Sequence, residues 1–296
     1  MSPDFPTTDA VRLIELALDE DLGDFGDVTG QLTIDAEARG RVAIVARQPG
    51  HVCGLPCAAL VSERIDGAIV VRPSAAEGQR VMPGETVAEL EGPVRGLLAA
   101  ERTILNLVTY LSGIATATAQ YVAAAREAAG EQAAAVLDTR KTLPGYRRLA
   151  KYAVACGGGT NHRMGLFDMV LVKDNHIAAA AAAEATQTLA DLVHEIRRRD
   201  DRGLPVMVEV DTLEQLRDVL PAAPDFVLLD NMPPRQLREA VALREELGAL
   251  ETQFEASGGI TLETVGEIAG TGVQRLSVGA ITHSVVALDF GFDWRA

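Results

Sequence analysis

The sequence predicts an α/β protein in which an incomplete (β/α) barrel follows an N-terminal α+β sandwich domain. Its 296 residues are enough for about two domains. Roughly the first 115 residues contain short strand-like runs broken by turns, whereas strands and helices alternate regularly from Gln132 onward. The strands of this second part are nearly continuous apolar runs that end in polar residues or glycine. Such runs are typical of a parallel sheet that is covered on both faces.

The N-terminal part begins with a predicted helix over residues 10–22, where Ile14, Leu18 and Leu22 have helical spacing and Gly23 ends the helix. Residues 40–54 and 68–98 then read as short strands joined by turns. The second of these runs is similar to biotinyl and lipoyl carrier domains. However, residues 41–96 contain no lysine to which a carried group could be attached. The sequence therefore predicts a small sandwich with one or two helices and argues against a carrier.

The second part contains six predicted strands, which is fewer than the eight of a closed barrel. They lie within residues 134–141, 169–175, 205–212, 226–232, 254–260 and 275–280. Helices are predicted between them at 145–156, in the alanine-rich run 178–183, and at 213–220, 234–247 and 261–269. Pro144 suits the first turn of the first of these helices. An open doubly wound sheet is the alternative, although no GxGxxG motif follows the first strand.

The net charge of −15 excludes general nucleic-acid binding and binding to anionic membranes, because both require a basic face. The uncharged stretch Thr103–Ala125 is long enough for a bilayer, but its many small and polar residues favour a buried helix of a soluble protein. The N-terminus shows no signal peptide. Cys53, Cys57 and Cys156 have no zinc or redox spacing and are interpreted as reduced thiols. Together these features indicate a cytoplasmic protein.

Polar residues end every predicted strand of the barrel, where the carboxyl ends of the strands should form one bowl. They are Asp138, Arg140, Lys141, Lys173, Asp174, Asn175, Glu209, Asp211, Asp230, Asn231, Glu255, Ser257, Gly258, Gly259, Ser277 and Gly279. Apolar strands accept ionised ends only at a solvent-exposed mouth, so these groups are expected to converge there. A single polar strand end would be unremarkable, but six successive ones indicate a site.

Positive charge is concentrated in one part of this acidic chain. The 39 residues from Asp138 to His176 contain seven Lys or Arg and three Asp, a net charge of +4, and the remaining residues carry −19. Arg147, Arg148 and Lys151 are interpreted as a solvated helix face. The basic groups at strand ends or in the glycine-rich loop are Arg140, Lys141, Arg163 and Lys173, with His162 beside them. Guanidinium groups in such places bind carboxylates or phosphates.

The last two strands end in glycine-containing turns that resemble the phosphate sites of many barrels. The turns are EASGGI, with Ser257, Gly258 and Gly259, and SVGA, with Ser277, Val278, Gly279 and Ala280. Glu209 and Asp230, on neighbouring strands, are suitable ligands for Mg²⁺ bridging a pyrophosphate. A salt bridge from either carboxylate to Lys173 or Arg163 is the alternative.

Long motifs resemble the quinolinate phosphoribosyltransferase family over nearly the whole chain. The longest is DTRKTLPGYRRLAKYAVACGGGTNHRMGLFDMVLVKDNH, and EDLGDFGDVT, ERTILN, VEVDTLEQL, LLDNM, EASGGI and ITHSVVALDF occur in the same order. Asp211 replaces a frequent glutamate of the family. The resemblance implies a sandwich domain over residues 1–116, to which residues 281–296 return, and a barrel over residues 117–280.

The resemblance also implies an activity, a metal and a set of site residues. The family joins quinolinate to 5-phosphoribosyl-1-pyrophosphate with Mg²⁺ and releases CO₂, pyrophosphate and nicotinate mononucleotide, a step of de novo NAD synthesis. The residues implied for quinolinate are Arg140, His162 and Arg163, with Arg102 reaching into the partner subunit's site of a homodimer. Lys141 and Lys173 would lie between the two substrates, Glu209 and Asp230 would hold magnesium pyrophosphate, and Ser257–Gly259 and Ser277–Ala280 would bind the 5-phosphate.

Three other functions are compatible with parts of the sequence. A lysine at a strand end, such as Lys173, suits a Schiff-base lyase. A metabolite-binding or carrier protein would use the sandwich domain, against which the missing lysine argues. A relative of the same fold could also act on a different aromatic substrate with the same phosphate motifs.

Overall fold

The computed structural model describes residues 3–130, 133–176 and 188–295, and the helix predicted at 178–183 lies outside them. It contains two compact units. One comprises Met1–Ala119, Lys141–Gly159 and Ile281–Ala296, and the other Gln120–Arg140 and Thr160–Ala280. From the sequence we expected one domain over residues 1–116 and 281–296 and a second over residues 117–280. Residues 141–159, which we assigned to the barrel, group with the N-terminal unit.

The first unit consists of a four-stranded antiparallel sheet, a two-stranded sheet and helices. Its strands are β1 (Arg39–Ala46), β2 (Gly50–His51), β3 (Val70–Pro73), β4 (Arg80–Val81), β5 (Thr86–Pro93) and β12 (Phe290–Arg295). Its helices are α1 (Thr7–Leu22), α2 (Val28–Thr33), α3 (Leu55–Ile65), α5 (Arg147–Cys156) and the first part of α4 (Val94–Ala129).

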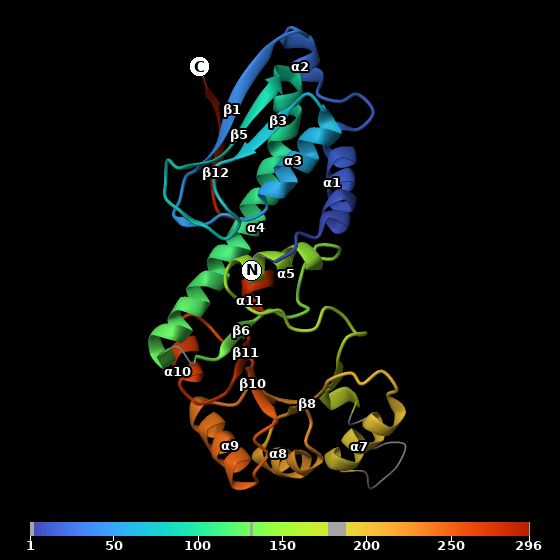
Figure 1. Cartoon of the computed structure of the whole chain (residues 1–296), viewed down its shortest axis with the longest axis vertical. Helices are drawn as coiled ribbons and strands as arrows, with labels where there is room; N and C mark the ends of the chain where they lie inside the picture. Colours follow the sequence, from blue (N-terminus) through green and yellow to red (C-terminus); the bar gives the residue numbers. More distant parts are fainter. Residues whose placement is uncertain (1–2, 131–132, 177–187, 296) are drawn as a thin grey trace. The chain divides into compact units, whose positions relative to one another are not determined.

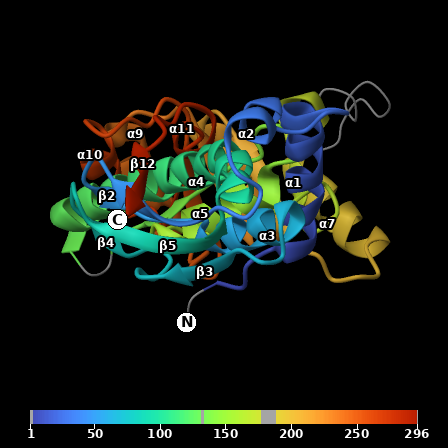
Figure 2. The same ribbon diagram turned by 90° about the horizontal axis from the view of Figure 1, so that it is seen from above.

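The larger sheet has the order β12-β1-β5-β3, so the C-terminal strand β12 pairs with the first strand of the chain. Residues 42–46 of β1 are all buried, because β1 lies between two other strands and both of its faces are covered. Helix α3 and the first part of α4 lie beside this sheet (Figures 1 and 2). This is the α+β architecture that the sequence predicted, with helices forming the layer opposite the main sheet.

The second unit is built on a six-stranded parallel sheet with the order β6-β11-β10-β9-β8-β7. The strands are β6 (Ala135–Leu137), β7 (Val170–Val172), β8 (Val206–Val210), β9 (Phe226–Asp230), β10 (Gln253–Ser257) and β11 (Arg275–Ser277). The helices are the end of α4, α7 (Leu189–Arg199), α8 (Leu213–Val219), α9 (Pro234–Glu246), α10 (Val265–Ala269) and α11 (Ala280–His283), with a 3₁₀ turn η2 (Leu220–Ala222). Ala280 alone of α11 belongs to this unit.

The strand order identifies an incomplete barrel rather than a doubly wound sheet. From β7 to β11 each strand pairs with the next in sequence, and the first strand β6 then pairs with the last, β11. A doubly wound sheet would instead begin in the middle and grow towards both edges. The helices α8 and α9 lie around the outside of these strands (Figure 1). The fold class predicted from the sequence is therefore confirmed.

Local sequence explains where several helices begin. Thr188 and Thr212 each accept a hydrogen bond from the backbone of the third helical residue, and both are part of a capping box at the start of α7 and α8. Pro234 occupies the first turn of α9, where its missing N–H has no consequence. No helix within the described ranges is long and apolar enough to cross a membrane, and this includes α4 with its uncharged stretch.

Two local predictions were wrong. Pro144 does not begin the helix that follows it, because residues 144–146 form a turn and α5 begins at Arg147. Lys151 does not lie on a solvated face: it is 1% exposed, on the side of α5 that packs into the first unit. A single amphipathic helix places residues 147 and 151 one turn apart, but the sequence did not show how far the neighbouring elements extend over it.

Candidate active site

Two rows of register partners, most of them polar, lie on one face of the parallel sheet near the carboxyl ends of its strands. Glu209, Leu228, Glu255 and Arg275 are register partners across β8, β9, β10 and β11. Two residues further along, Asp230, Ser257 and Ser277 are register partners in the same way. Alternate residues of a strand share a face, so both rows point to the same side of the sheet. The strands β8, β9, β10 and β11 thus present polar residues near their carboxyl ends on one face of the sheet.

Lys173, directly after β7, forms a salt bridge with Glu209. The Lys173 side chain is 42% exposed and the Glu209 side chain is 12% exposed, so the pair lies at the boundary between core and solvent. The salt bridge that the sequence offered as an alternative for Glu209 is therefore what the structure contains. Asp230 is a second acidic group on this face of the sheet. It is part-exposed, and its carboxylate accepts a hydrogen bond from the Asn231 side chain at 2.6 Å.

Glu255 is fully buried, contrary to the expectation that ionised strand ends lie at an exposed mouth. Its carboxylate oxygens lie 3.2 Å from Nε2 of His162 and 2.8 Å from Nε of Arg275. Burial opposes ionisation of Glu255, but the hydrogen bonds and charges of these two partners outweigh burial and hold its pKa below the ordinary value. The carboxylate can be buried because it is paired on both sides.

Asp138, at the end of β6, is also fully buried and organises the glycine-rich loop. Its carboxylate accepts the backbone N–H of His162 at 3.0 Å and the side-chain amide of Asn161 at 2.7 Å. The backbone of Thr160 runs parallel to β6 and bonds to it. Asp138 therefore fixes the segment that carries His162 and Arg163 against the edge of the sheet.

The ring of His162 has protein partners at both nitrogens. Nδ1 accepts the backbone N–H of Arg163 at 2.7 Å, which leaves the proton on Nε2, facing Glu255. The family resemblance implies that His162 contacts a quinolinate carboxylate. In the structure the ring holds the backbone of Arg163 in place.

Arg163 is 8% exposed, and its guanidinium group donates to the carbonyl oxygen of Met169 at 3.2 Å. Burial and the neighbouring positive charge of Arg140 lower the pKa of Arg163, while Asp168 acts in the opposite direction. Asp168 also accepts the backbone N–H groups of Met164 and Gly165, at 2.6 and 2.9 Å, and so shapes the loop. The positive charges of Arg140 and Arg163 influence each other, and such a pair of guanidinium groups suits an anion with two carboxylates.

The turn after β10 requires glycine. Gly258 has a φ of +96°, and a Cβ there would lie 2.1 Å from Oδ1 of Asn231. Gly259 has a φ of +59° and nothing within 4 Å of an added Cβ. Both glycines are exposed, and within the described part of the chain neither donates its N–H to another group. Such N–H groups are suited to phosphate oxygens. Ser277 and Val278 in the other turn are buried, whereas Gly279 and Ala280 are part-exposed.

The remaining predicted residues, Arg102 and Lys141, belong to the first unit. Arg102 is exposed on α4, as a helix surface residue would be. Lys141 is exposed, and its carbonyl oxygen accepts the hydroxyl of Thr282 at 2.9 Å. All the other predicted site residues belong to the second unit.

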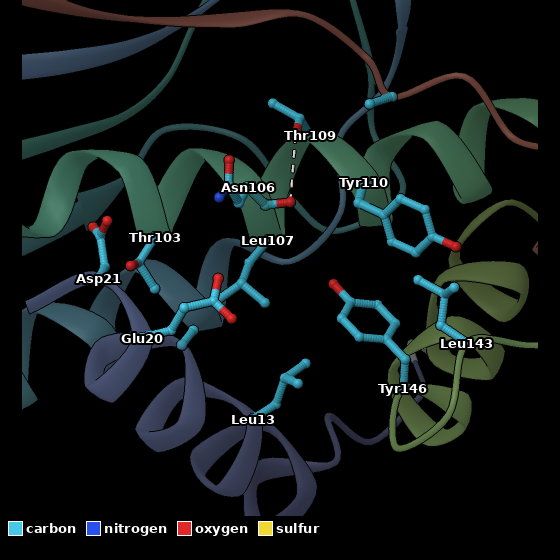
Figure 3. A pocket seen from close by; sticks show the side chains of 12 residues that line it. Leu13, Glu20, Asp21, Thr103, Asn106, Leu107, Thr109, Tyr110, Leu143 and Tyr146 are labelled. Atoms are coloured by element: carbon cyan, nitrogen blue, oxygen red, sulfur yellow. Dashed lines mark hydrogen bonds between the residues drawn. The ribbon is translucent and has the colours of Figure 1, made fainter. Parts of the chain in front are cut away.

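A separate pocket of about 400 Å³ lies in the first unit, between α1, α4 and residues 143–146 (Figure 3). Leu13, Leu107 and the edge-to-face pair Tyr110 and Tyr146 give it an apolar lining, and Glu20 is at its rim. No residue of the predicted site lines this pocket. Thr103, which lines the pocket, directly follows the predicted residue Arg102 in the sequence.

Sequence reasoning missed the groups that hold the site in shape: Asp138, Asp168, Glu255 and Arg275. Asp138 and Glu255 were predicted as strand ends but expected at a solvent-exposed mouth, and no role was predicted for Arg275 or Asp168. A charged residue inside an otherwise apolar strand was the available signal, since such a residue needs a buried partner.

Comparison with known proteins decides the family. The C-terminal domain of quinolinate phosphoribosyl transferase matches residues 114–293, and its N-terminal domain matches residues 27–112. The chain belongs to the quinolinate phosphoribosyltransferase family. Both domains of the family are therefore present in the expected order, and the resemblance seen in the motifs is confirmed.

Individual relatives cover the chain almost completely. Nicotinate-nucleotide pyrophosphorylase [carboxylating] of Mycobacterium leprae is 44% identical over 288 residues, which are 96% of this chain and 97% of the relative. Quinolinate phosphoribosyltransferase [decarboxylating] 1b of Nicotiana tabacum is 39% identical and spans 97% of this chain and 83% of its own length. The solved nicotinate-nucleotide pyrophosphorylase of Francisella tularensis has a TM-score of 0.89 at 35% identity, covering 100% of this chain and 99% of its own.

Proposed function

We propose that this protein transfers the phosphoribosyl group of 5-phosphoribosyl-1-pyrophosphate to the ring nitrogen of quinolinate. One carboxylate is lost as CO₂, and the products are nicotinate mononucleotide and pyrophosphate, as in de novo NAD synthesis. The observation that carries this proposal is the match of both family domains over nearly the whole chain. The polar residues near the carboxyl ends of the parallel strands provide hydrogen-bonding and charged groups that two anionic substrates require.

Quinolinate is a dianion, and Arg140 and Arg163 are the groups that bind it in this proposal. Burial and then the like charge of Arg140 lower the pKa of Arg163, and a bound anion would offset the repulsion between the two groups. His162 acts on the same end of the site by holding the backbone of Arg163. A planar guanidinium group can bind a carboxylate with two parallel hydrogen bonds, so this arrangement also orients the pyridine ring.

The phosphorylated sugar is assigned to the turns that follow β10 and β11. The exposed N–H groups of Gly258 and Gly259, with Ser257, bind the 5-phosphate, together with Ser277, Val278, Gly279 and Ala280. Lys173 lies near the departing pyrophosphate and compensates its charge. The serine residues are register partners on adjacent strands, so their positions are fixed by the sheet.

Glu209 and Asp230 are the proposed ligands of Mg²⁺, and their donor chemistry fits this ion. Both are part-exposed carboxylates that point to the same face from adjacent strands. Mg²⁺ usually keeps several waters and needs only one or two protein carboxylates besides substrate phosphate oxygens. When bound, the ion neutralises charge that develops on pyrophosphate.

Positioning and electrostatics account for the chemistry without a covalent nucleophile. The site aligns the pyridine nitrogen with the anomeric carbon of the ribose, and the bond to pyrophosphate breaks as the new C–N bond forms. The ring nitrogen then carries a positive charge, which stabilises the electron pair left on the adjacent ring carbon as CO₂ departs. That carbon takes up one proton from solvent to give nicotinate mononucleotide. Lys173 is held by Glu209 as a charged ammonium group. This argues against a Schiff-base lyase, which needs a neutral amine.

Lys141 is assigned a place between quinolinate and the phosphoribosyl group. Arg102 is assigned to the partner subunit's site in a homodimer. Complementation tests this arrangement. Arg102→Ala and Arg163→Ala should each abolish most activity, and co-refolded mixtures of the two should recover up to about a quarter of it, because some dimers then contain one intact site. Activity can recover in the mixture only if each active site contains residues of both subunits. If no activity returns in a mixture shown to contain heterodimers, this arrangement is contradicted.

The proposed activity is tested by supplying quinolinate, 5-phosphoribosyl-1-pyrophosphate and Mg²⁺ and identifying the product by mass spectrometry. Nicotinate mononucleotide is expected. Nicotinate and other pyridine carboxylates serve as competing substrates, because a relative acting on a different aromatic acid would prefer one of them. A folded protein that forms no nicotinate mononucleotide would contradict the proposal.

A further inference from the structure

Two cysteines and a glutamate of the first unit form a cluster that the proposed reaction does not use. The Sγ atoms of Cys53 and Cys156 and one carboxylate oxygen of Glu77 all lie within 4.8 Å of one another. The three come from separate places in the fold: the link between β2 and α3, the turn between β3 and β4, and the last residue of α5. From this geometry we propose that the cluster binds a thiophilic divalent cation such as Zn²⁺ through these three side chains.

The carboxylate of Glu77 is held in a fixed orientation. It accepts the backbone N–H groups of Gly54 and Leu55 at 2.7 and 2.8 Å, at the start of α3. It also accepts the hydroxyl of Tyr152 at 2.9 Å. A carboxylate has about four acceptor sites, so one remains beside these three donors. The Cys53 thiol also hydrogen-bonds to Glu77, and a cation would take the place of its proton. The negative charge of Glu77 is meanwhile stabilised by the N-terminus of α3.

The turn that carries Glu77 lies directly against the end of α5. Gly78 has a φ of +76°, and a Cβ at this position would lie 2.5 Å from the carbonyl oxygen of Cys156. On the other side, the backbone N–H of Cys53 donates to Oγ of Ser112 at 2.8 Å, and this hydroxyl donates back to the Cys53 carbonyl at 3.2 Å. All three ligand residues are therefore positioned by their own backbone contacts.

The spacing suits a tetrahedral ion. Zn–S bonds of about 2.3 Å place two thiolates about 3.8 Å apart, so the observed separations require shifts of at most about 1 Å. Three protein ligands leave a fourth position for water. Cys53 is buried, whereas Cys156 and Glu77 are part-exposed, so an ion can enter from their side.

The two thiols differ in acidity. A hydrogen bond from Cys53 lowers the pKa of Cys156 despite its partial burial, and burial raises the pKa of Cys53 well above its ordinary value. Metal ligation replaces the thiol protons, so binding should release protons and become tighter as the pH rises.

Cys57 provides a matched control. It is also fully buried and lies on α3, but it is not part of the cluster. Its thiol is not among the three groups that lie within 4.8 Å of one another, so Cys57→Ser leaves the proposed ligands in place.

The test is a titration of the reduced, full-length protein with Cd²⁺, followed by the ultraviolet thiolate-to-cadmium charge-transfer band. One ion per chain is expected in the wild type and in Cys57→Ser. The band should be absent in Cys156→Ser. In Glu77→Gln the affinity for Cd²⁺ should fall at least tenfold. Added Zn²⁺ should displace Cd²⁺ and remove the band. A cation bound by Glu209 and Asp230 gives no such band, so the result does not depend on the proposed activity.

Folding of the variants is checked separately. Cys156 is part-exposed, so Cys156→Ser is expected to fold, and Zn²⁺ should raise the Tm of the wild type but not that of this variant. The proposal is overturned if the reduced wild type gives no band, if Cys156→Ser retains it, or if Cys57→Ser loses it equally. Formation of a Cys53–Cys156 disulfide in a protein that binds no Cd²⁺ when reduced would also overturn it.

Discussion

Replacement of Glu255 by glutamine should destabilise the protein strongly although the side chain keeps its size. The carboxylate is 0% exposed and is shared between His162 at 3.2 Å and Arg275 at 2.8 Å. Breaking a buried ion pair by removing one partner costs about 3–5 kcal/mol, because the other partner is left buried without compensation. We expect about 3 kcal/mol for Glu255→Gln, since the amide oxygen can still accept one of the two hydrogen bonds.

Urea unfolding followed by circular dichroism measures this loss as a lower midpoint with an unchanged slope. Glu267→Gln is the matched control in the same unit, because Glu267 faces Arg238 at 3.9 Å and both side chains are more than half exposed. That change should cost less than about 1 kcal/mol. Equal small losses in the two variants would refute the view that Glu255 is a charged, doubly paired group.

The pH dependence provides a second check on the same residue. The pKa of Glu255 is below its ordinary value in the folded protein, so its ionised form stabilises the fold. This contribution is fully present above the unfolded-state pKa of about 4.3 and is lost as the pH falls through the lower folded-state value. The difference in stability between wild type and Glu255→Gln should therefore be constant near neutral pH and shrink in acid. A difference that grows in acid would contradict the assignment.

Two further substitutions test the substrate groups. Arg163→Lys removes the planar guanidinium group but keeps the positive charge, so it should weaken quinolinate binding about 10- to 100-fold. In calorimetry the affinity for 5-phosphoribosyl-1-pyrophosphate should change less than about threefold. Equal losses of affinity for the two substrates would count against the assignment of Arg163 to quinolinate. Gly258→Ala meets a φ of +96° and Oδ1 of Asn231 at 2.1 Å. It should cost about 1–3 kcal/mol in urea unfolding and raise the KM for the phosphoribosyl substrate. Gly248→Ala, at a φ of +67° with nothing within 4 Å, is the control for backbone strain alone and should leave that KM unchanged.

Much of this architecture was predictable because the signals are local. Apolar runs that end in Lys173, Glu209 or Ser257 predict parallel strands with a polar rim, whatever lies around them. The glycines at 258 and 259 predict a turn for the same reason. The long basic motif from Asp138 to His176 predicts the anionic nature of the substrate through its charge.

The remaining features depend on contacts between distant segments, which a sequence does not display. Asp138 and Glu255 look like solvent-exposed strand ends until the glycine-rich loop folds back over them. Lys151 looks like a helix surface residue until the first unit closes around α5. The closeness of Cys53 to Cys156 also has no sequence spacing to reveal it.

The most direct test of the proposed activity is the ratio of the two products that leave the substrates. Quinolinate labelled with ¹³C in its 2-carboxyl group is supplied with 5-phosphoribosyl-1-pyrophosphate and Mg²⁺, and labelled CO₂ and pyrophosphate are quantified together. The proposal predicts one CO₂ for each pyrophosphate throughout the time course. Pyrophosphate release without labelled CO₂, or faster release with nicotinate than with quinolinate, would contradict it.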